Sequence, residues 1–132
     1  MTVFVDTSAL YALLDPDDAH HVAAADYLAG LEEAATELVT HDYVVVETTA
    51  LLQSRLGMAS VRRLHRHVLP AVTVRSVPPQ VREAAVAALL AADKRRVSLV
   101  DRVSFELMRR WELEATFAFD TDFDRQGFTC VP

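Results

Sequence analysis

The sequence predicts an α/β fold, a three-layer α/β/α sandwich in which a parallel sheet of four to five strands lies between two layers of helices. Short apolar runs rich in Val and Phe alternate along the chain with longer segments of helical periodicity. The chain has 132 residues and neither an internal repeat nor a linker, so residues 1–132 are expected to form a single domain. Hydrophobic residues make up 52% and charged residues 24%, which excludes a disordered chain.

The first predicted elements are a strand and a short helix. Residues 3–5 are β-branched or aromatic, and this run stops at the Asp-Thr-Ser sequence of residues 6–8, which favours a helix start. Residues 9–14 then predict a helix that ends in the Asp-rich segment 15–18.

A second helix and a second strand follow. We expect Asp17 or Asp18 to cap a helix that runs to about Ala35. The side chains at helical spacing, expected to face inward, are Val22, Ala25, Leu28 and Leu31. Residues 38–40 predict the strand.

Residues 43–69 contain one ambiguous segment and one basic helix. Residues 43–46 favour a strand by their β-branching, whereas residues 47–56, followed by Gly57, favour a helix with a glycine cap. Residues 60–69 predict a basic helix that Pro70 stops.

The second half of the chain predicts two long helices and three strands. Residues 72–77 alternate as a strand does, and residues 79–95 form an Ala- and Leu-rich helix. Ser98 and Asp101 fit the capping-box pattern of a helix over residues 98–112. The last two strands are predicted at residues 116–119 and 128–131, on either side of a polar turn that ends in Gly127.

Charge is distributed unevenly along the chain. Residues 1–53 carry a net charge of −10, with no Lys or Arg, whereas residues 54–110 carry +8 and the last 22 residues −4. The net charge of −6 argues against a passive nucleic-acid coat protein. It is compatible with an enzyme whose acidic centre binds metal while a basic region holds a polyanion.

Composition also limits the cellular context. The single cysteine, Cys130, forms neither an internal disulfide nor a cysteine-based zinc site. The start of the chain lacks the pattern of a signal peptide, and no apolar run reaches the ~20 residues of a membrane span. We therefore expect a cytoplasmic protein without a membrane partner.

Four carboxylates stand in or beside apolar sequence: Asp6, Glu47, Asp101 and Asp120. Asp6 and Asp120 directly follow predicted strands, and the carboxyl ends of parallel strands open on one edge of the sheet. Uncompensated burial of clustered carboxylates is costly, whereas a divalent cation with oxygen ligands reverses the repulsion. Mg²⁺ or Mn²⁺ is the natural candidate, and it would activate a water for attack on a phosphodiester.

Each carboxylate has a structural alternative when it is taken alone. Asp6 suits a helix N-cap, and Asp101 is explained by the capping box that Ser98 begins. Glu47 suits a solvent-facing position. The acids of residues 120–124 suit a tight turn.

The four acids taken together resemble the successive motifs of PIN-domain ribonucleases, most closely the VapC toxins of bacterial type II toxin–antitoxin pairs. The similar segments are Val3–Leu10, Tyr43–Glu47, Ser98–Ser104 and Phe117–Phe123, in family order over nearly the whole chain. The resemblance implies metal-binding and catalytic roles for Asp6, Glu47, Asp101 and Asp120, and it places Glu47 on a helix. Asp122 is a second candidate for the fourth acid.

The resemblance also implies a substrate and partners. It predicts an Mg²⁺- or Mn²⁺-dependent endoribonuclease that acts as a toxin, works as a homodimer and is neutralised by an antitoxin protein. Thr7 or Ser8 is expected as a hydroxyl neighbour of the site. Independently of the resemblance, Arg102 follows Asp101 in the sequence and is expected either to contact substrate phosphate or to pair with a surface acid. The apolar residues expected to line an antitoxin groove are Leu10, Tyr11, Leu14, Leu28, Leu31, Leu51, Leu52 and Leu56.

Two other functions compete with a nuclease. A haloacid-dehalogenase-type phosphatase also begins with a strand and an Asp, but it needs a second Asp where this chain has Ser8. A catalytically silent RNA- or protein-binding module of the same fold has no need to concentrate negative charge beside RNA. A metal site at His20 and His21 is disfavoured, because no cysteine accompanies them and they follow an Asp-rich turn.

Overall fold

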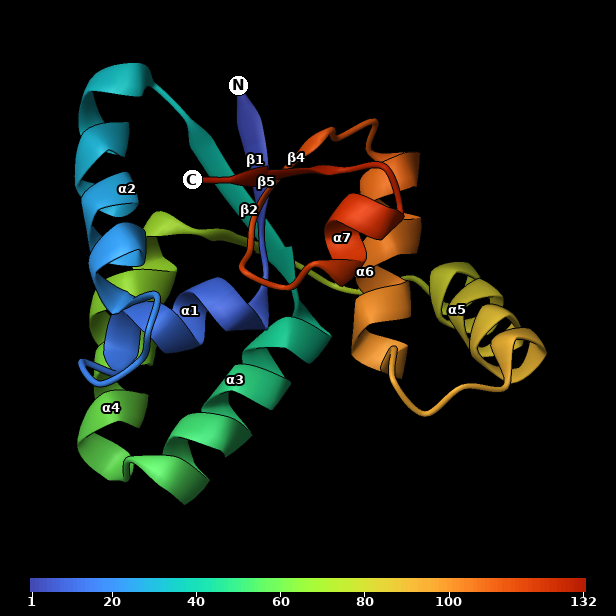
Figure 1. The fold of residues 1–132 in the computed structure, drawn as a ribbon, viewed down its shortest axis with the longest axis horizontal. Coiled ribbons are helices and arrows are strands. Elements are labelled where there is room, and N and C mark those ends of the chain that lie inside the picture. The colour runs from blue at the N-terminus through green and yellow to red at the C-terminus, as the bar shows by residue number, and fades with distance from the viewer.

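The computed structural model describes residues 1–132 and contains one five-stranded sheet (Figure 1). Its strand order is β3-β2-β1-β4-β5, and every neighbouring pair is parallel. The strands are β1 (Thr2–Val5), β2 (Glu37–His41), β3 (Thr73–Arg75), β4 (Ala115–Phe117) and β5 (Thr129–Val131). The predicted parallel α/β fold is confirmed.

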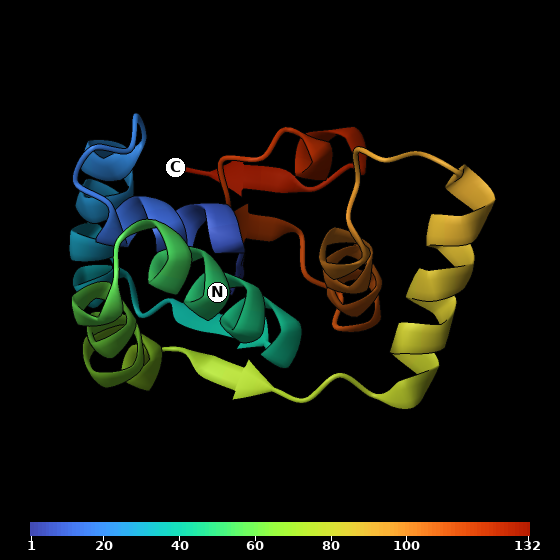
Figure 2. The ribbon, with the colours of Figure 1, turned by 90° about the horizontal axis from the view of Figure 1, so that it is seen from below.

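Helices cover both faces of this sheet, and the view from below in Figure 2 separates the two groups. One group contains α1 (Thr7–Leu14), α2 (His21–Ala34), α3 (Asp42–Arg55) and α4 (Met58–Arg63). On the other side lie α5 (Pro79–Ala92), α6 (Leu99–Arg110) and the short α7 (Asp122–Arg125). Contacts of α1 with α2 and α3, and of α5 with α6, hold each group together.

The hydrophobic core is built around the central strand. Val3, Phe4 and Val5 of β1 are at most 1% exposed, so all faces of this strand are covered, as a parallel sheet requires. A second, smaller core joins α5 to α6 through Val81, Ala85, Val103 and Leu107.

The ambiguous segment is helical, because α3 begins at Asp42 and continues through Glu47. Local β-branching would favour a strand, but the buried His41 caps the helix. Its Nδ1 accepts hydrogen bonds from the backbone N–H groups of Tyr43 (3.2 Å) and Val44 (3.4 Å). Tertiary packing and capping therefore override the local propensity.

Two expectations for the helical layer need correction. Residues 60–69 are helical, but as α4, a π-helical turn at Leu64–Val68 and a 3₁₀ turn at Leu69–Ala71 rather than one regular helix, and Pro70 lies within the last turn instead of stopping the helix before it. The start of α2 lies at His21, and neither Asp17 nor Asp18 caps it, because the Asp18 carboxylate accepts from the His20 N–H (2.8 Å) within the loop.

The inward face of α2 also differs from the expectation. Leu28 and Leu31 pack against the core as expected. Val22, however, is 69% exposed and Ala24 is fully buried, so the start of the helix presents a different face from the predicted one. No helix of the chain is both long enough and apolar enough to cross a membrane.

Candidate active site

The strand order reverses between β1 and β4, which are neighbours at the centre of the sheet. The connections after β1 lead toward β2 and β3, whereas β4 and β5 extend the sheet on the other side. In parallel sheets the crevice at such a reversal is the usual ligand-binding position. Asp6 directly follows β1, and Asp120 lies just beyond β4, so both acids lie at this crevice.

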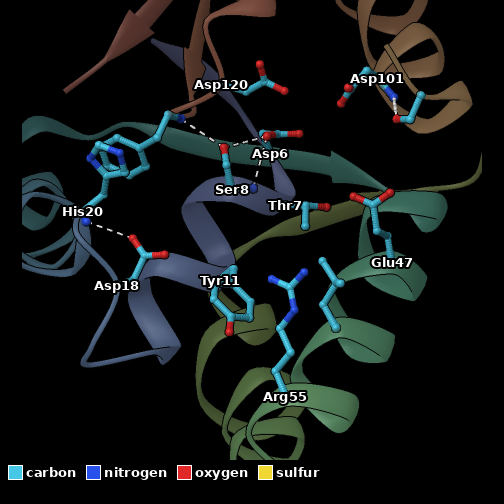
Figure 3. A pocket seen from close by; sticks show the side chains of 13 residues that line it. Asp6, Thr7, Ser8, Tyr11, Asp18, His20, Glu47, Arg55, Asp101 and Asp120 are labelled. Carbon is cyan, nitrogen blue, oxygen red and sulfur yellow. Dashed lines mark hydrogen bonds between the residues drawn. The ribbon is translucent and has the colours of Figure 1, made fainter. Parts of the chain in front are cut away.

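An open cleft of about 430 Å³ lies at this edge of the sheet. All four predicted acids line it, together with Asp18 from the loop before α2. Figure 3 shows the carboxylates of Asp6, Asp101 and Glu47 turned toward one another; Asp6 lies between β1 and α1, Asp101 on α6 and Glu47 on α3. The sequence-predicted constellation is therefore brought together in one cleft.

Asp6 is the most constrained of these acids, with an exposed fraction of 3%. Its Oδ2 accepts hydrogen bonds from the Ser8 hydroxyl (2.6 Å) and the Ser8 N–H (3.1 Å), which also caps α1. Its buried Oδ1 has no hydrogen-bond partner. Burial raises the pKa of Asp6 to about 6 in spite of the two hydrogen bonds. A buried oxygen without a partner is costly, so Oδ1 fits the role of a metal ligand.

Asp101 shows how strongly the acids interact. The Ser98 hydroxyl accepts from the Asp101 N–H (3.1 Å) and thereby caps α6, as predicted. Burial raises the pKa of Asp101 to about 7, and repulsion from Asp6, Asp120 and Glu47 adds to this rise. The capping box therefore explains the helix start, but it does not account for the charge of Asp101 among other carboxylates.

Asp120 and Asp122 share the last part of the site. One carboxylate oxygen from each of Asp101, Asp120 and Asp122 lies within 4.8 Å of the others. Asp120 Oδ1 accepts from the Asp122 N–H (2.9 Å), and Asp122 accepts from Arg125 (3.2 Å). The hydrogen bond of the turn is thus accepted by Asp120, one of the acids that the sequence assigned both to a turn and to the metal site. Asp120 lines the cleft as well.

The three residues predicted beside the acids occupy different places. Ser8 holds Asp6 in position, and Thr7 lines the cleft while it accepts from Thr48 of α3 (3.2 Å). Arg102 is not among the side chains that line the cleft, and its buried Nε has no hydrogen-bond partner. Its contact with substrate phosphate stays a prediction.

A buried histidine joins the two helices that carry Glu47 and Asp101. His41 Nδ1 accepts from the first turn of α3, and its Nε2 donates to Ser104 Oγ of α6 (2.9 Å). The Ser104 hydroxyl in turn donates to the Val100 carbonyl (3.0 Å). This network requires the neutral ring with its proton on Nε2, and burial lowers the pKa of His41 to about 4. His41 thus fixes the relative position of α3 and α6.

Comparison with known proteins agrees with this geometry. The PIN domain family matches residues 3–129. The chain belongs to the PIN-domain family. The 23S rRNA-specific endonuclease VapC20 of Mycobacterium tuberculosis is 35% identical over 130 residues, which cover 98% of this chain and 97% of VapC20. The similarity to VapC-type PIN toxins inferred from the motifs is thereby confirmed.

Solved structures resemble this chain over 96% of its length or more. The crystal structure of M. tuberculosis VapC20, described as a sarcin–ricin loop cleaving toxin, superposes with a TM-score of 0.83 and 32% identity, covering 96% of this chain and 95% of that one. FitAcB from Neisseria gonorrhoeae superposes with a TM-score of 0.69 and 14% identity, covering 100% and 97% of the two chains, which shows the shared fold.

The donor set of this PIN domain suits a hard divalent cation. All candidate ligands are carboxylate oxygens. The buried Asp6 Oδ1 has no hydrogen-bond partner, and the pKa values of Asp6 and Asp101 are raised. A divalent cation at this position would satisfy the Asp6 oxygen and relieve the repulsion among the acids.

Seven residues that line the cleft were not predicted to lie there: Tyr11, Asp18, His20, Leu51, Arg55, Ser98 and Phe119. None of them follows a strand directly, and each belongs to a segment that local patterns assign to a helix, turn or strand. The antitoxin groove expected from the sequence included three residues that are not on the surface. Leu10, Leu14 and Leu52 are buried in the core, because α1 packs against both α2 and α3.

Proposed function

We propose that this PIN-domain protein is an Mg²⁺- or Mn²⁺-dependent endoribonuclease and the toxin of a type II toxin–antitoxin pair, acting in the cytoplasm. The observation that carries the proposal is the convergence of Asp6, Glu47, Asp101 and Asp120 in one cleft, with the Asp6 Oδ1 left without a partner. The similarity to VapC20 over almost the whole chain supports RNA as the substrate.

The four acids hold the metal in this proposal, with Asp122 as an additional ligand candidate. A bound divalent cation supplies a water of lowered pKa and neutralises charge on the phosphate. Hydrogen bonds within the chain hold the acids and their helices in fixed positions. Ser8 fixes Asp6, the Ser98 cap fixes the first turn of α6, and His41 ties that helix to α3.

Ribosomal RNA is the substrate class that the comparisons favour, since VapC20 is a 23S rRNA-specific endonuclease and a sarcin–ricin loop cleaving toxin. The test is incubation of intact ribosomes and purified RNA with the protein, followed by mapping of new 5′ ends. We expect a discrete cut in 23S rRNA with Mg²⁺ or Mn²⁺ and no cut in EDTA. Equal cleavage in EDTA, or no RNA cleavage with either metal, would contradict the proposal.

Asp120 and Asp122 can be separated by substitutions that keep the turn. In Asp120→Asn and Asp122→Asn the amide oxygen still accepts hydrogen bonds, so only the charge is lost. We expect Asp120→Asn to lose more cleavage activity than Asp122→Asn, because Asp120 lines the cleft and Asp122 is paired with Arg125. Initial rates at saturating Mn²⁺ measure the difference, and a greater loss in Asp122→Asn would reverse the assignment.

A protein partner and a homodimer complete the proposal. The half-buried Leu28, Leu31 and Leu51 and the exposed Leu56 remain available to an antitoxin segment. The net charge of −10 over residues 1–53 favours a basic segment, with an association rate that falls as salt rises.

Co-expression with the neighbouring upstream open reading frame tests the partner. We expect an inactive complex, because a cation of the antitoxin would compete with the metal at the carboxylates. Recovery of the protein alone and fully active would exclude that partner. Light scattering after size exclusion tests the dimer, and a monomer at tens of micromolar would contradict it.

A further inference from the structure

One side of the cleft carries an aromatic pair that the acid cluster does not use. The imidazole of His20 lies parallel to the ring of Phe119, with 4.4 Å between the ring centroids and 8° between the planes. Both residues line the cleft, and Figure 3 shows His20 on the side of the cleft near Asp18. The pair presents a flat surface at the edge of the site.

The His20 ring is held in place but forms no hydrogen bond of its own. Its backbone N–H donates to Asp18 Oδ1 (2.8 Å), and its side chain does not cap α2 although it stands at the start of that helix. His20 is exposed and one ring face covers Phe119, so the other face and both ring nitrogens are free for a ligand.

Phe119 connects this surface to the catalytic acids. Its N–H donates to Ser8 Oγ (3.0 Å), and the same hydroxyl donates to Asp6 Oδ2 (2.6 Å). Two hydrogen bonds therefore separate the aromatic pair from a metal-ligand candidate. A group stacked on His20 would lie in the same cleft as the carboxylates.

Arg55 supplies a positive charge in the same cleft. It is the sole Lys or Arg among the lining residues, and its guanidinium lies 5.4 Å from the centroid of the Tyr11 ring. It forms no ion pair, although five carboxylates line the cleft. Figure 3 shows its guanidinium extending from the end of α3 toward the middle of the cleft. Its donors are free for a phosphate, whose geometry suits the guanidinium fork.

We propose that this half of the cleft binds one unpaired nucleotide beside the scissile phosphate, with its base stacked on His20 and an adjacent phosphate on Arg55. The proposal rests on the endoribonuclease function given above and adds a requirement for single-stranded or looped RNA. A base inside an A-form helix is already stacked on its neighbours, whereas a splayed base can stack on an aromatic ring.

Steady-state cleavage of a synthetic RNA that carries the sarcin–ricin loop tests the two contacts. We expect His20→Gln to raise KM at least about fivefold, the lower range of base–aromatic stacking, with kcat within about twofold. His20→Tyr restores the ring and should restore KM. Arg55→Gln should raise KM and flatten its salt dependence, while the matched change Arg82→Gln, at an exposed site of α5 outside the cleft, leaves both unchanged.

A binding measurement without turnover keeps this test separate from the cleavage function. The fluorescence of 2-aminopurine placed in the RNA loop should fall on binding to the wild-type protein in EDTA, and fall less with His20→Gln. Unchanged KM and unchanged quenching in His20→Gln would overturn the nucleotide site. So would a His20→Gln protein that keeps its KM for RNA but no longer binds its antitoxin. Quenching without cleavage in Mg²⁺ would support the site and count against the catalytic proposal alone.

Discussion

We expect Asp101→Asn to abolish RNA cleavage and at the same time to stabilise the fold. The loss of activity follows because Asp101 is a metal-ligand candidate surrounded by three other acids, so its charge has no substitute. We expect a fall in cleavage rate of at least about 10³-fold, the scale on which loss of an electrostatic catalytic group acts. Initial rates on the same RNA measure it.

The gain in stability has a definite sign. The pKa of Asp101 is raised from 3.8 to about 7, so the folded state binds this proton more tightly than the unfolded state does. The resulting destabilisation is absent below pH 3.8 and complete above pH 7. Discounted for partial exposure, Asn should raise the free energy of unfolding by roughly 2 kcal/mol at pH 8 without metal.

The matched control is Asp26→Asn, at an exposed site of α2 outside the cleft. It should change neither activity nor stability by a measurable amount. An Asp101→Asn protein that is less stable than the wild type at pH 8 in EDTA would show that the carboxylate is compensated by the fold itself.

Substitution of His41 by Leu has the largest expected effect on stability. It leaves the N–H groups of Tyr43 and Val44 without their acceptor and removes the link from α3 to Ser104. We expect a loss of about 2–4 kcal/mol in the free energy of unfolding. His41→Asn retains a cap acceptor and should recover about 1 kcal/mol, whereas Ser104→Ala, which removes the α6 link alone, should cost about 1 kcal/mol. Urea denaturation measures all three.

The same histidine makes stability depend on pH. Its pKa falls from 6.5 to about 4 on folding, so the unfolded state binds the proton more tightly and stability decreases as pH drops from 6.5 toward 4. Asp6 and Asp101, with raised pKa values, act in the opposite direction over an overlapping range. The difference in the free energy of unfolding between wild type and His41→Asn isolates the histidine. It should change by about 3 kcal/mol in favour of the variant between pH 7 and pH 4, so that the variant is at least as stable as the wild type at pH 4. A pH-independent difference would contradict the neutral, Nε2-protonated ring.

The candidate site could be predicted from the sequence best where a carboxylate directly follows a predicted strand. Asp6 and Asp120 follow strands of a parallel sheet, and the reversal of strand order brings these strand ends together. The position of Asp101 in the first turn of a helix could be predicted because Ser98 and Asp101 fit the capping-box pattern. Glu47 lies between a Val run that favours a strand and a segment that favours a helix, and the family resemblance was needed to place it on the helix. The capping role of His41 has no local signature.

The remaining features depend on long-range packing, which local patterns do not encode. His20 and Phe119 are 99 residues apart in the chain and meet because the loop before α2 folds over the end of β4. Leu10, Leu14 and Leu52 have the same apolar character as the surface leucines, and only the contacts of α1 decide that they are buried. The break after α4 likewise depends on how Pro70 is accommodated.

Calorimetric titration of the metal-free protein with Mn²⁺ tests most directly that the acid cluster is a metal centre. We expect saturable binding by the wild type and by Asp26→Asn, and at least about tenfold weaker binding by Asp6→Asn and Asp101→Asn, each of which removes one anionic ligand. Binding of equal strength in all four proteins would place the metal elsewhere, and no saturable binding by the folded wild type would contradict the account.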